Sequence, residues 1–179
     1  MQSVFDLPII PENEPARLAA LDRYHLLDNA PAGAFNHIAA MAVRMFDVPV
    51  ALVNLVGADT VLTTGAVGEI AAGTQIPRGI SLCSLAVLRP EPLVFENALQ
   101  EPCLLVNPMV TDHFGLRFYA AAPITTSDGY LIGAVCLIDK KPRTFTAGEQ
   151  KVLAGLAQIV MEDLEARFRR IPPSTTPTA

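Results

Sequence analysis

Two long apolar stretches, residues 118–125 and 130–139, flank the tripeptide Ser127-Asp128-Gly129. Asp-Gly between β-rich stretches is a strong signal for a tight hairpin, because the turn needs a positive φ that glycine adopts without strain. The two stretches are therefore predicted to be adjacent antiparallel strands. This hairpin constrains the rest of the fold, since the other strands of the sheet must pair along its edges.

The other elements are predicted from hydrophobic periodicity and from the positions of glycine and proline. Thr146 and Glu149 have the spacing of a capping box and indicate where the last helix begins. The expected elements are helices over about 13–27, 35–47, 81–88 (capped by Ser81) and from 146, strands over 48–56, 61–67 and 93–96, and irregular connections over 68–79 and 97–116. Hairpins outnumber crossovers in this order. We therefore expect an α/β (α+β) fold with a central, mostly antiparallel sheet of five to six strands and the N- and C-terminal helices packed on one face.

The composition is that of one soluble domain. Of 179 residues, 51% are hydrophobic and 17% charged, which excludes a disordered chain. The net charge of −5 argues against a nucleic-acid partner, and no apolar run reaches the ~18 residues that a membrane span needs. The N-terminus lacks the basic region of a signal peptide, so we expect a cytoplasmic protein. Residues 1–12 are expected to be a flexible lead-in, 13–170 the folded domain and 171–179 a disordered tail.

Cys83 is the leading candidate for chemistry. It lies two residues after Ser81, where the N-terminus of the predicted short helix lowers a thiol pKa, and Arg78 nearby is expected to add to that effect. The alternative is a small buried apolar residue without reactivity. Cys103 lies in a proline-bounded loop and forms a redox couple with Cys83 only if their Cα atoms approach within about 7 Å. Cys136, inside an apolar strand, is expected to be inert core.

Three further residues are candidate ligand contacts. Arg117 and Tyr119 begin a strand beside the long loop, where a guanidinium and an aromatic ring suit a planar or anionic small molecule. The alternative is the ordinary alternation of surface and core residues along a strand. His113, next to an aspartate in the same loop, is the third candidate. The histidines and cysteines do not have the spacing of metal ligands, so no metal site is expected.

Four separated stretches carry a resemblance to a known family. They are residues 13–56, IPRGISLCSLAVL (76–88), PLVFENALQEPCLLVNPMV (92–110) and 116–160. In this order they resemble the GAF domains of bacteria, both stand-alone and sensor-kinase-associated, so that residues 13–170 are expected to form one GAF domain. The resemblance implies a small-molecule pocket between the sheet and the loops on its open face, and pairing through the terminal helices.

Two cofactors are disfavoured by departures from the patterns of their branches. Bilin-binding members usually carry Cys-His, whereas Ser84 follows Cys83 here. The Asn-Lys-x-x-x-Phe…Asp-Glu pattern of the cyclic-nucleotide-binding branch is absent from the sequence. Cys103 and Asn97 also replace the basic residue and the aspartate that many relatives carry. The ligand is therefore unknown.

Two functions follow as hypotheses. The first is a sensory, regulatory domain in bacterial signal transduction that binds a small molecule at Arg78, Cys83, His113, Arg117 and Tyr119. It would act through a homodimer, built on helices 16–27 and 149–168, or through a signalling partner protein. The second is a free methionine-R-sulfoxide reductase that uses Cys83 and Cys103, because QIPRGISLC is similar to the stretch before the active-site cysteine of those enzymes. A scaffold with a vestigial pocket is a third possibility.

Overall fold

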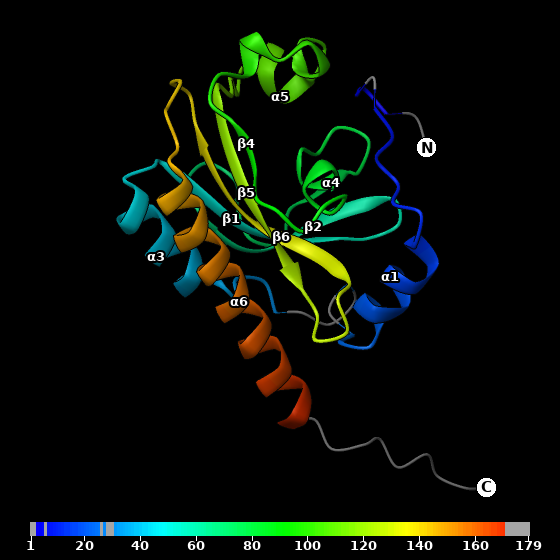
Figure 1. Ribbon diagram of the computed structural model, residues 1–179. Coiled ribbons are helices and arrows are strands. Elements are labelled where there is room, and N and C mark those ends of the chain that lie inside the picture. Colours follow the sequence, from blue (N-terminus) through cyan, green and yellow to red (C-terminus); the bar gives the residue numbers. More distant parts are fainter. Residues whose placement is uncertain (1–2, 6, 26, 28–30, 171–179) are drawn as a thin grey trace, which may run out of the picture.

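The computed structural model describes residues 3–5, 7–25, 27 and 31–170. Its centre is a six-stranded sheet in the order β3-β2-β1-β6-β5-β4, in which every pair is antiparallel. Figure 1 shows helices on both sides of this sheet. The strands are β1 (Val50–Val56), β2 (Thr60–Val67), β3 (Gln75–Pro77), β4 (Leu93–Phe95), β5 (Phe118–Thr125) and β6 (Leu131–Asp139). The predicted fold class, an α+β fold on a mostly antiparallel sheet, is confirmed.

The predicted hairpin forms strands β5 and β6, of which β6 lies beside β1 in the middle of the sheet. Strands β5 and β6 pair from Phe118 opposite Asp139 to Thr125 opposite Leu131. Gly129 has φ +90°, and its N–H donates to the Thr126 carbonyl at 2.9 Å, which closes the turn. Almost every residue of the two strands is buried, because both faces of the sheet are covered.

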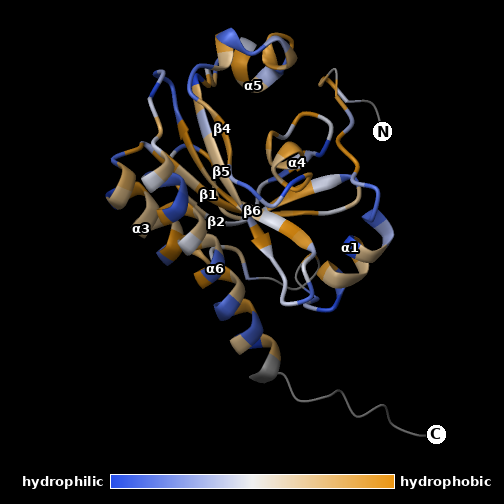
Figure 2. Cartoon of the chain, in the orientation of Figure 1, coloured by the Kyte–Doolittle hydropathy of each residue, from blue (hydrophilic) through white to orange (hydrophobic). Residues whose placement is uncertain are grey.

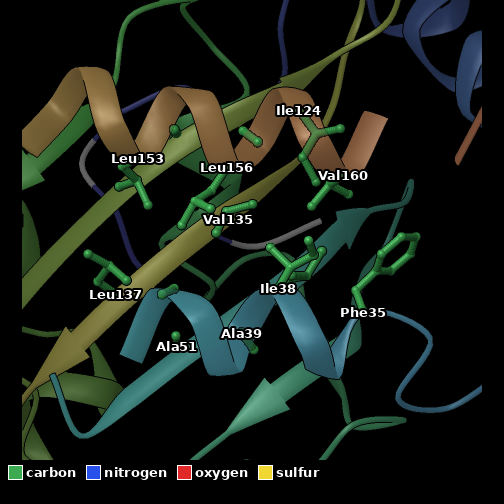
Figure 3. Close-up of a cluster of buried hydrophobic side chains, with 14 of the residues drawn as sticks. Phe35, Ile38, Ala39, Ala51, Ile124, Val135, Leu137, Leu153, Leu156 and Val160 are labelled. Atoms are coloured by element: carbon green, nitrogen blue, oxygen red, sulfur yellow. The ribbon is translucent and has the colours of Figure 1, made fainter. Parts of the chain in front are cut away.

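One face of the sheet is covered by α3 (Asn36–Phe46) and α6 (Ala147–Arg170). Figure 3 shows Leu153, Leu156 and Val160 of α6 pointing toward strand residues that α3 also contacts. The capping box is present at the start of α6: the Thr146 hydroxyl accepts from the Glu149 N–H, and the Glu149 carboxylate accepts from the Thr146 N–H. Ala20 and Leu21 of α1 (Glu14–Asp22) belong to the same buried cluster, so the N- and C-terminal helices lie on one face, as expected.

The opposite face is covered by short elements, most of which lie in stretches predicted to be irregular connections. The stretch 97–116 folds into two 3-10 turns (Ala98–Gln100 and Pro102–Leu104) and α5 (Pro108–Thr111), while β3 extends the sheet within 68–79. With α4 (Cys83–Ala86), these segments enclose a second apolar cluster. In Figure 1, α4 and α5 lie away from α3 and α6.

Several expected boundaries differ in the structure. The first helix, α1 (Glu14–Asp22), ends before Leu27, because His25 adopts φ +50°. The helix after Ser81 has only four residues, and Ser81 does not cap it. The lead-in packs in part: Phe5 and Ile9 are buried in the second cluster. The expected disordered tail, 171–179, lies outside the described residues. Among the described helices none is both long and apolar enough to cross a membrane.

Candidate functional site

A cavity of about 190 Å³ lies between the open face of the sheet and the short elements that cover it. It is predominantly apolar. Its walls come from all the strands except β4, from α4 and α5, and from the connections between them. The lining residues are Leu52, Asn54, Thr63, Ile70, Thr74, Ile76, Ser81, Leu82, Cys83, Met109, Phe114, Leu116, Tyr119, Cys136 and Ile138. The list holds no Asp, Glu, Lys, Arg or His, so the ionisable side chains of the described wall are those of Cys83, Cys136 and Tyr119.

Four polar side chains form a hydrogen-bonded cluster in the cavity wall. The Cys83 Sγ accepts from the Tyr119 hydroxyl at 3.1 Å and from the Asn54 Nδ2 at 3.2 Å. The Cys136 Sγ lies 3.9 Å from the Cys83 Sγ and 3.8 Å from the Asn54 Nδ2. All four side chains are almost fully buried. The sulfur of Cys83 is therefore the point on which the polar groups converge.

Strand alternation explains why these residues meet. Successive side chains of a strand point to opposite faces, so Leu52 and Asn54 of β1 face the second cluster while Val53 faces the first. A bulge adjusts the pairing of β1 with β2 at Val53 and Asn54, and bulges often redirect side chains near functional sites. In β6 the same alternation places Cys136 on the open face, beside β1.

The pKa values of the two thiols are driven apart. A hydrogen bond from Cys136 lowers the pKa of Cys83, against the opposing effect of burial, with further contributions from Asn54, Tyr119 and Ser81. The pKa of Cys136 is raised, first by its interaction with Cys83 and then by burial. Burial and the neighbouring sulfurs also raise the pKa of Tyr119. Cys83 is therefore the thiol of the pair that ionises first, with Cys136 retaining its proton.

One atom of the cluster has no partner. Asn54 is only 3% exposed, and its Oδ1 accepts no hydrogen bond from the described residues. A buried carbonyl oxygen without a donor costs free energy of about 1–3 kcal/mol. Because Asn54 lines the cavity, a molecule there with an N–H or O–H group would satisfy this acceptor.

Of the predicted site residues, the structure brings only Cys83 and Tyr119 to this cavity. His113 is exposed and does not line it. Arg117 donates to the carbonyls of Val110 at 3.1 Å and Leu116 at 2.9 Å, so its guanidinium holds the loop before β5. Cys103 is half-buried in the second 3-10 turn, and burial raises the pKa of its thiol.

The expectation that Arg78 acts on Cys83 is wrong. Arg78 is fully buried, and its guanidinium forms an ion pair with Glu14 of α1 and donates to the Gly57 carbonyl at 3.0 Å. Its charge is paired with Glu14, and Arg78 does not line the cavity. Arg78 directly follows β3, and from that position its guanidinium reaches Glu14 of α1.

Cys136 is buried in the second cluster, as expected, and its sulfur also lies in the cavity wall against Cys83. Asn54 was not predicted at all. A detectable signal existed: asparagine is depleted in strands, and Asn54 interrupts the apolar stretch VALVNLV. Within the described residues, no group of three or more His, Cys, Asp or Glu side chains is placed to hold a metal ion.

Comparison with known proteins agrees with this architecture. The profile of the GAF domain matches residues 31–164, three quarters of the chain. The chain belongs to the GAF domain family. This GAF domain is 31% identical over 156 residues to a cyclic di-GMP phosphodiesterase of Pseudomonas aeruginosa. That similarity covers 86% of the chain and 26% of the phosphodiesterase, so the chain spans about a quarter of its relative.

Solved structures show the same fold. The free methionine-R-sulfoxide reductase of Neisseria meningitidis, solved with its substrate, superposes on the GAF domain with a TM-score of 0.64 and 21% identity, covering 88% of this chain and 89% of the reductase. The GAF domain of a phosphoenolpyruvate-protein phosphotransferase from Acinetobacter gives a TM-score of 0.61 at 15% identity, over 86% and 96% of the two chains. At these identities the likeness establishes the fold alone.

Proposed function

We propose that this GAF domain is a sensory module that binds a small, neutral, largely apolar molecule with a hydrogen-bond donor in the cavity over Cys83. The observation that carries the proposal is the unpartnered Asn54 Oδ1 in a predominantly apolar cavity wall that holds no Asp, Glu, Lys, Arg or His. A pocket of this kind binds its ligand through apolar burial and uses one or two polar groups for orientation. The similarity to about a quarter of a cyclic di-GMP phosphodiesterase supports a regulatory role linked to a separate output.

The alternative function, reduction of free methionine-R-sulfoxide with Cys83 and Cys103, has less support. That substrate carries an ammonium and a carboxylate, and a charge buried without a partner costs several kcal/mol. The lining side chains listed above include no guanidinium or ammonium group for the carboxylate and no carboxylate for the ammonium. The thiol beside Cys83 is that of Cys136, whereas Cys103 does not line the cavity.

Indole and 1-methylindole test the proposal, because they share a ring system while only indole has an N–H. The cavity volume suits a bicyclic ring or smaller, given that an apolar cavity of roughly 150 Å³ in another protein binds benzene. In calorimetric titrations we expect saturable binding of indole and about tenfold weaker binding of 1-methylindole, because one hydrogen bond is worth ~1 kcal/mol and the acceptor would stay unpaired.

Two threonine variants provide the matched comparison. Thr74 lines the cavity and is half-buried, whereas Thr60 is exposed at the start of β2. Thr74→Phe is expected to fill the cavity and abolish indole binding, and Thr60→Phe to leave it unchanged. Equal affinities for indole and 1-methylindole, or full indole binding by Thr74→Phe, would place the ligand elsewhere and contradict the proposal.

We also propose that the domain acts as a homodimer through the outer face of α6. Val152 and Ile159, two turns apart on this helix, are 42% and 41% exposed, while their neighbours Leu153, Leu156 and Val160 are buried. Figure 2 shows hydrophobic positions continuing along α6 beyond the sheet. Exposed apolar residues in a row on one helix are typical of a pairing surface.

Light scattering at micromolar concentration should give the mass of two chains for the unmodified protein and of one chain for Ile159→Glu, because the substitution places a charge in the interface. Gln158→Glu adds the same charge at an exposed neighbouring position and should remain dimeric. A monomer mass for the unmodified protein would rule out this interface.

A further inference from the structure

The cavity contains a pair of thiols that the sensory function described above does not use. The sulfurs of Cys83 and Cys136 are 3.9 Å apart, both are almost fully buried, and both line the cavity. A disulfide requires a sulfur separation of about 2.05 Å, so the two sulfurs must approach by about 1.9 Å. They are 53 positions apart in the sequence, and a bond between them would tie α4 to the middle of the sheet.

We propose that Cys83 and Cys136 form an oxidant-sensing dithiol, in which a hydroperoxide that enters the cavity converts the two thiols into a disulfide. The inference uses the same cavity as the proposed ligand site and rests on that cavity being accessible to small molecules. It differs in the event that is sensed, because the oxidant is consumed and leaves a covalent change in the protein.

The reaction balances in two steps. Cys83 loses its proton, and its sulfur attacks one oxygen of the hydroperoxide; the O–O bond breaks, and the departing alkoxide or hydroxide takes up that proton. Cys83 is then a sulfenic acid. The Cys136 sulfur attacks the Cys83 sulfur, the S–O bond breaks, and the departing hydroxide combines with the Cys136 proton to form water. Overall, two thiols and one hydroperoxide give one disulfide, one alcohol (or water) and one water.

The surroundings assign different roles to the two cysteines. The Tyr119 hydroxyl and the Asn54 amide, at 3.1 and 3.2 Å, both donate to the Cys83 sulfur and so stabilise its thiolate, the nucleophilic form. These contacts and the hydrogen bond from Cys136 lower the pKa of Cys83 and leave the proton on Cys136. Cys83 is therefore the thiol that attacks the peroxide, and Cys136 is the thiol that resolves the sulfenic acid.

The disulfide would also change the structure around the cavity. Forming it removes the thiolate that the Asn54 amide and the Tyr119 hydroxyl contact, and it pulls α4 toward β6. The lining at Ser81 and Leu82, directly before Cys83, must then shift. Oxidation is therefore expected to change the cavity and with it the affinity for an apolar ligand.

The test is peptide mapping of the full, reduced chain after treatment with hydrogen peroxide. We expect an intact mass lower by two hydrogen atoms and a peptide pair joined through Cys83 and Cys136, which dithiothreitol separates again. This measurement uses the unmodified protein, so its result does not depend on whether a variant folds. A pair joined through Cys103, or Cys83 and Cys136 remaining thiols while Cys103 is oxidised, would overturn the proposal.

Variants then separate the roles of the side chains. Cys136→Ala should stop at a Cys83 sulfenic acid that dimedone traps, and Cys83→Ala should leave Cys136 unreacted over the same time. Tyr119→Phe removes one donor and keeps the ring, so it should slow oxidation about fivefold, which corresponds to one hydrogen bond of ~1 kcal/mol. Cys103→Ser should oxidise at the unmodified rate. Tyr119→Phe oxidising at the unmodified rate would contradict the role given to that donor.

Indole binding to the same samples distinguishes the two proposals. If indole binds and the disulfide does not form, the dithiol proposal fails and the sensory function stands. If the disulfide forms and indole does not bind, the ligand proposal fails and the dithiol stands. If both hold, saturating indole should slow the oxidation, because it blocks the route by which the peroxide enters.

Discussion

Replacing Glu14 by glutamine is expected to lower the free energy of unfolding by about 3–5 kcal/mol, because two buried guanidinium groups would lose their only carboxylate among the described residues. Arg17 and Arg78 are 1% and 0% exposed. The Arg17 Nε and Nη2 donate to the two Glu14 oxygens at 2.8 and 2.9 Å, and Arg78 pairs with the same carboxylate from the other side. The amide of the glutamine variant has nearly the same shape as the Glu14 carboxylate but carries no charge.

The same ion cluster predicts a dependence of stability on pH. Burial alone would raise the pKa of Glu14, but the hydrogen bonds and charges of Arg17 and Arg78 outweigh it and lower the pKa from 4.5 to about 2. A carboxyl whose pKa is lower in the folded state contributes stability above its unfolded pKa and loses it as the pH falls through the folded pKa. The contribution should therefore be complete above pH 4.5 and disappear between pH 4.5 and about 2.

Urea denaturation at several pH values measures both effects. Glu12→Gln removes an exposed carboxylate two positions away and is the matched control, for which we expect a change within about 0.5 kcal/mol. Glu14→Gln should also flatten the loss of stability between pH 4.5 and 2. If Glu14→Gln and Glu12→Gln have the same stability at pH 7, the cluster does not hold α1 to the sheet.

Gly133→Ala is expected to destabilise the fold by about 3 kcal/mol or more, because no space exists for a Cβ atom at this position. An added Cβ would overlap the backbone carbonyl oxygen of Asn54 and lie 3.2 Å from the Leu55 Cα. Backbone atoms of a central strand cannot move aside as a flexible side chain can, so β1 and β6 would have to separate. For a domain of this size the melting temperature should fall by roughly 6–12 °C.

Gly155→Ala is the matched control for this variant. Gly155 is exposed on α6, and nothing lies within 4 Å of a Cβ built there. Since alanine has a higher helix propensity than glycine, this variant should be slightly more stable than the unmodified protein. Gly133→Ala melting at the unmodified temperature would show that β1 and β6 are not packed as closely as the structure has them.

The sequence alone determined the features that depend on neighbouring residues. The hairpin follows from the two apolar stretches on either side of Asp128-Gly129, and the start of α6 from the Thr146 and Glu149 pair three positions apart. The antiparallel sheet follows from the count of hairpins, and the family from motifs in order. Short elements such as β3 and α5 were missed, because three or four residues carry too little periodicity to be recognised.

Only the tertiary structure decided which cysteines meet and where the buried arginines point. Cys83 contacts Cys136 because α4 packs on β6, and Asn54 joins them because β1 lies next to β6 in the sheet; both contacts join segments far apart in the chain. Arg78 pairs with Glu14, 64 positions away, and not with Cys83. The electrostatic partner of a side chain depends on distance in space. Contacts between residues far apart in the sequence are fixed by the packing of the whole domain, so local residue patterns do not indicate them.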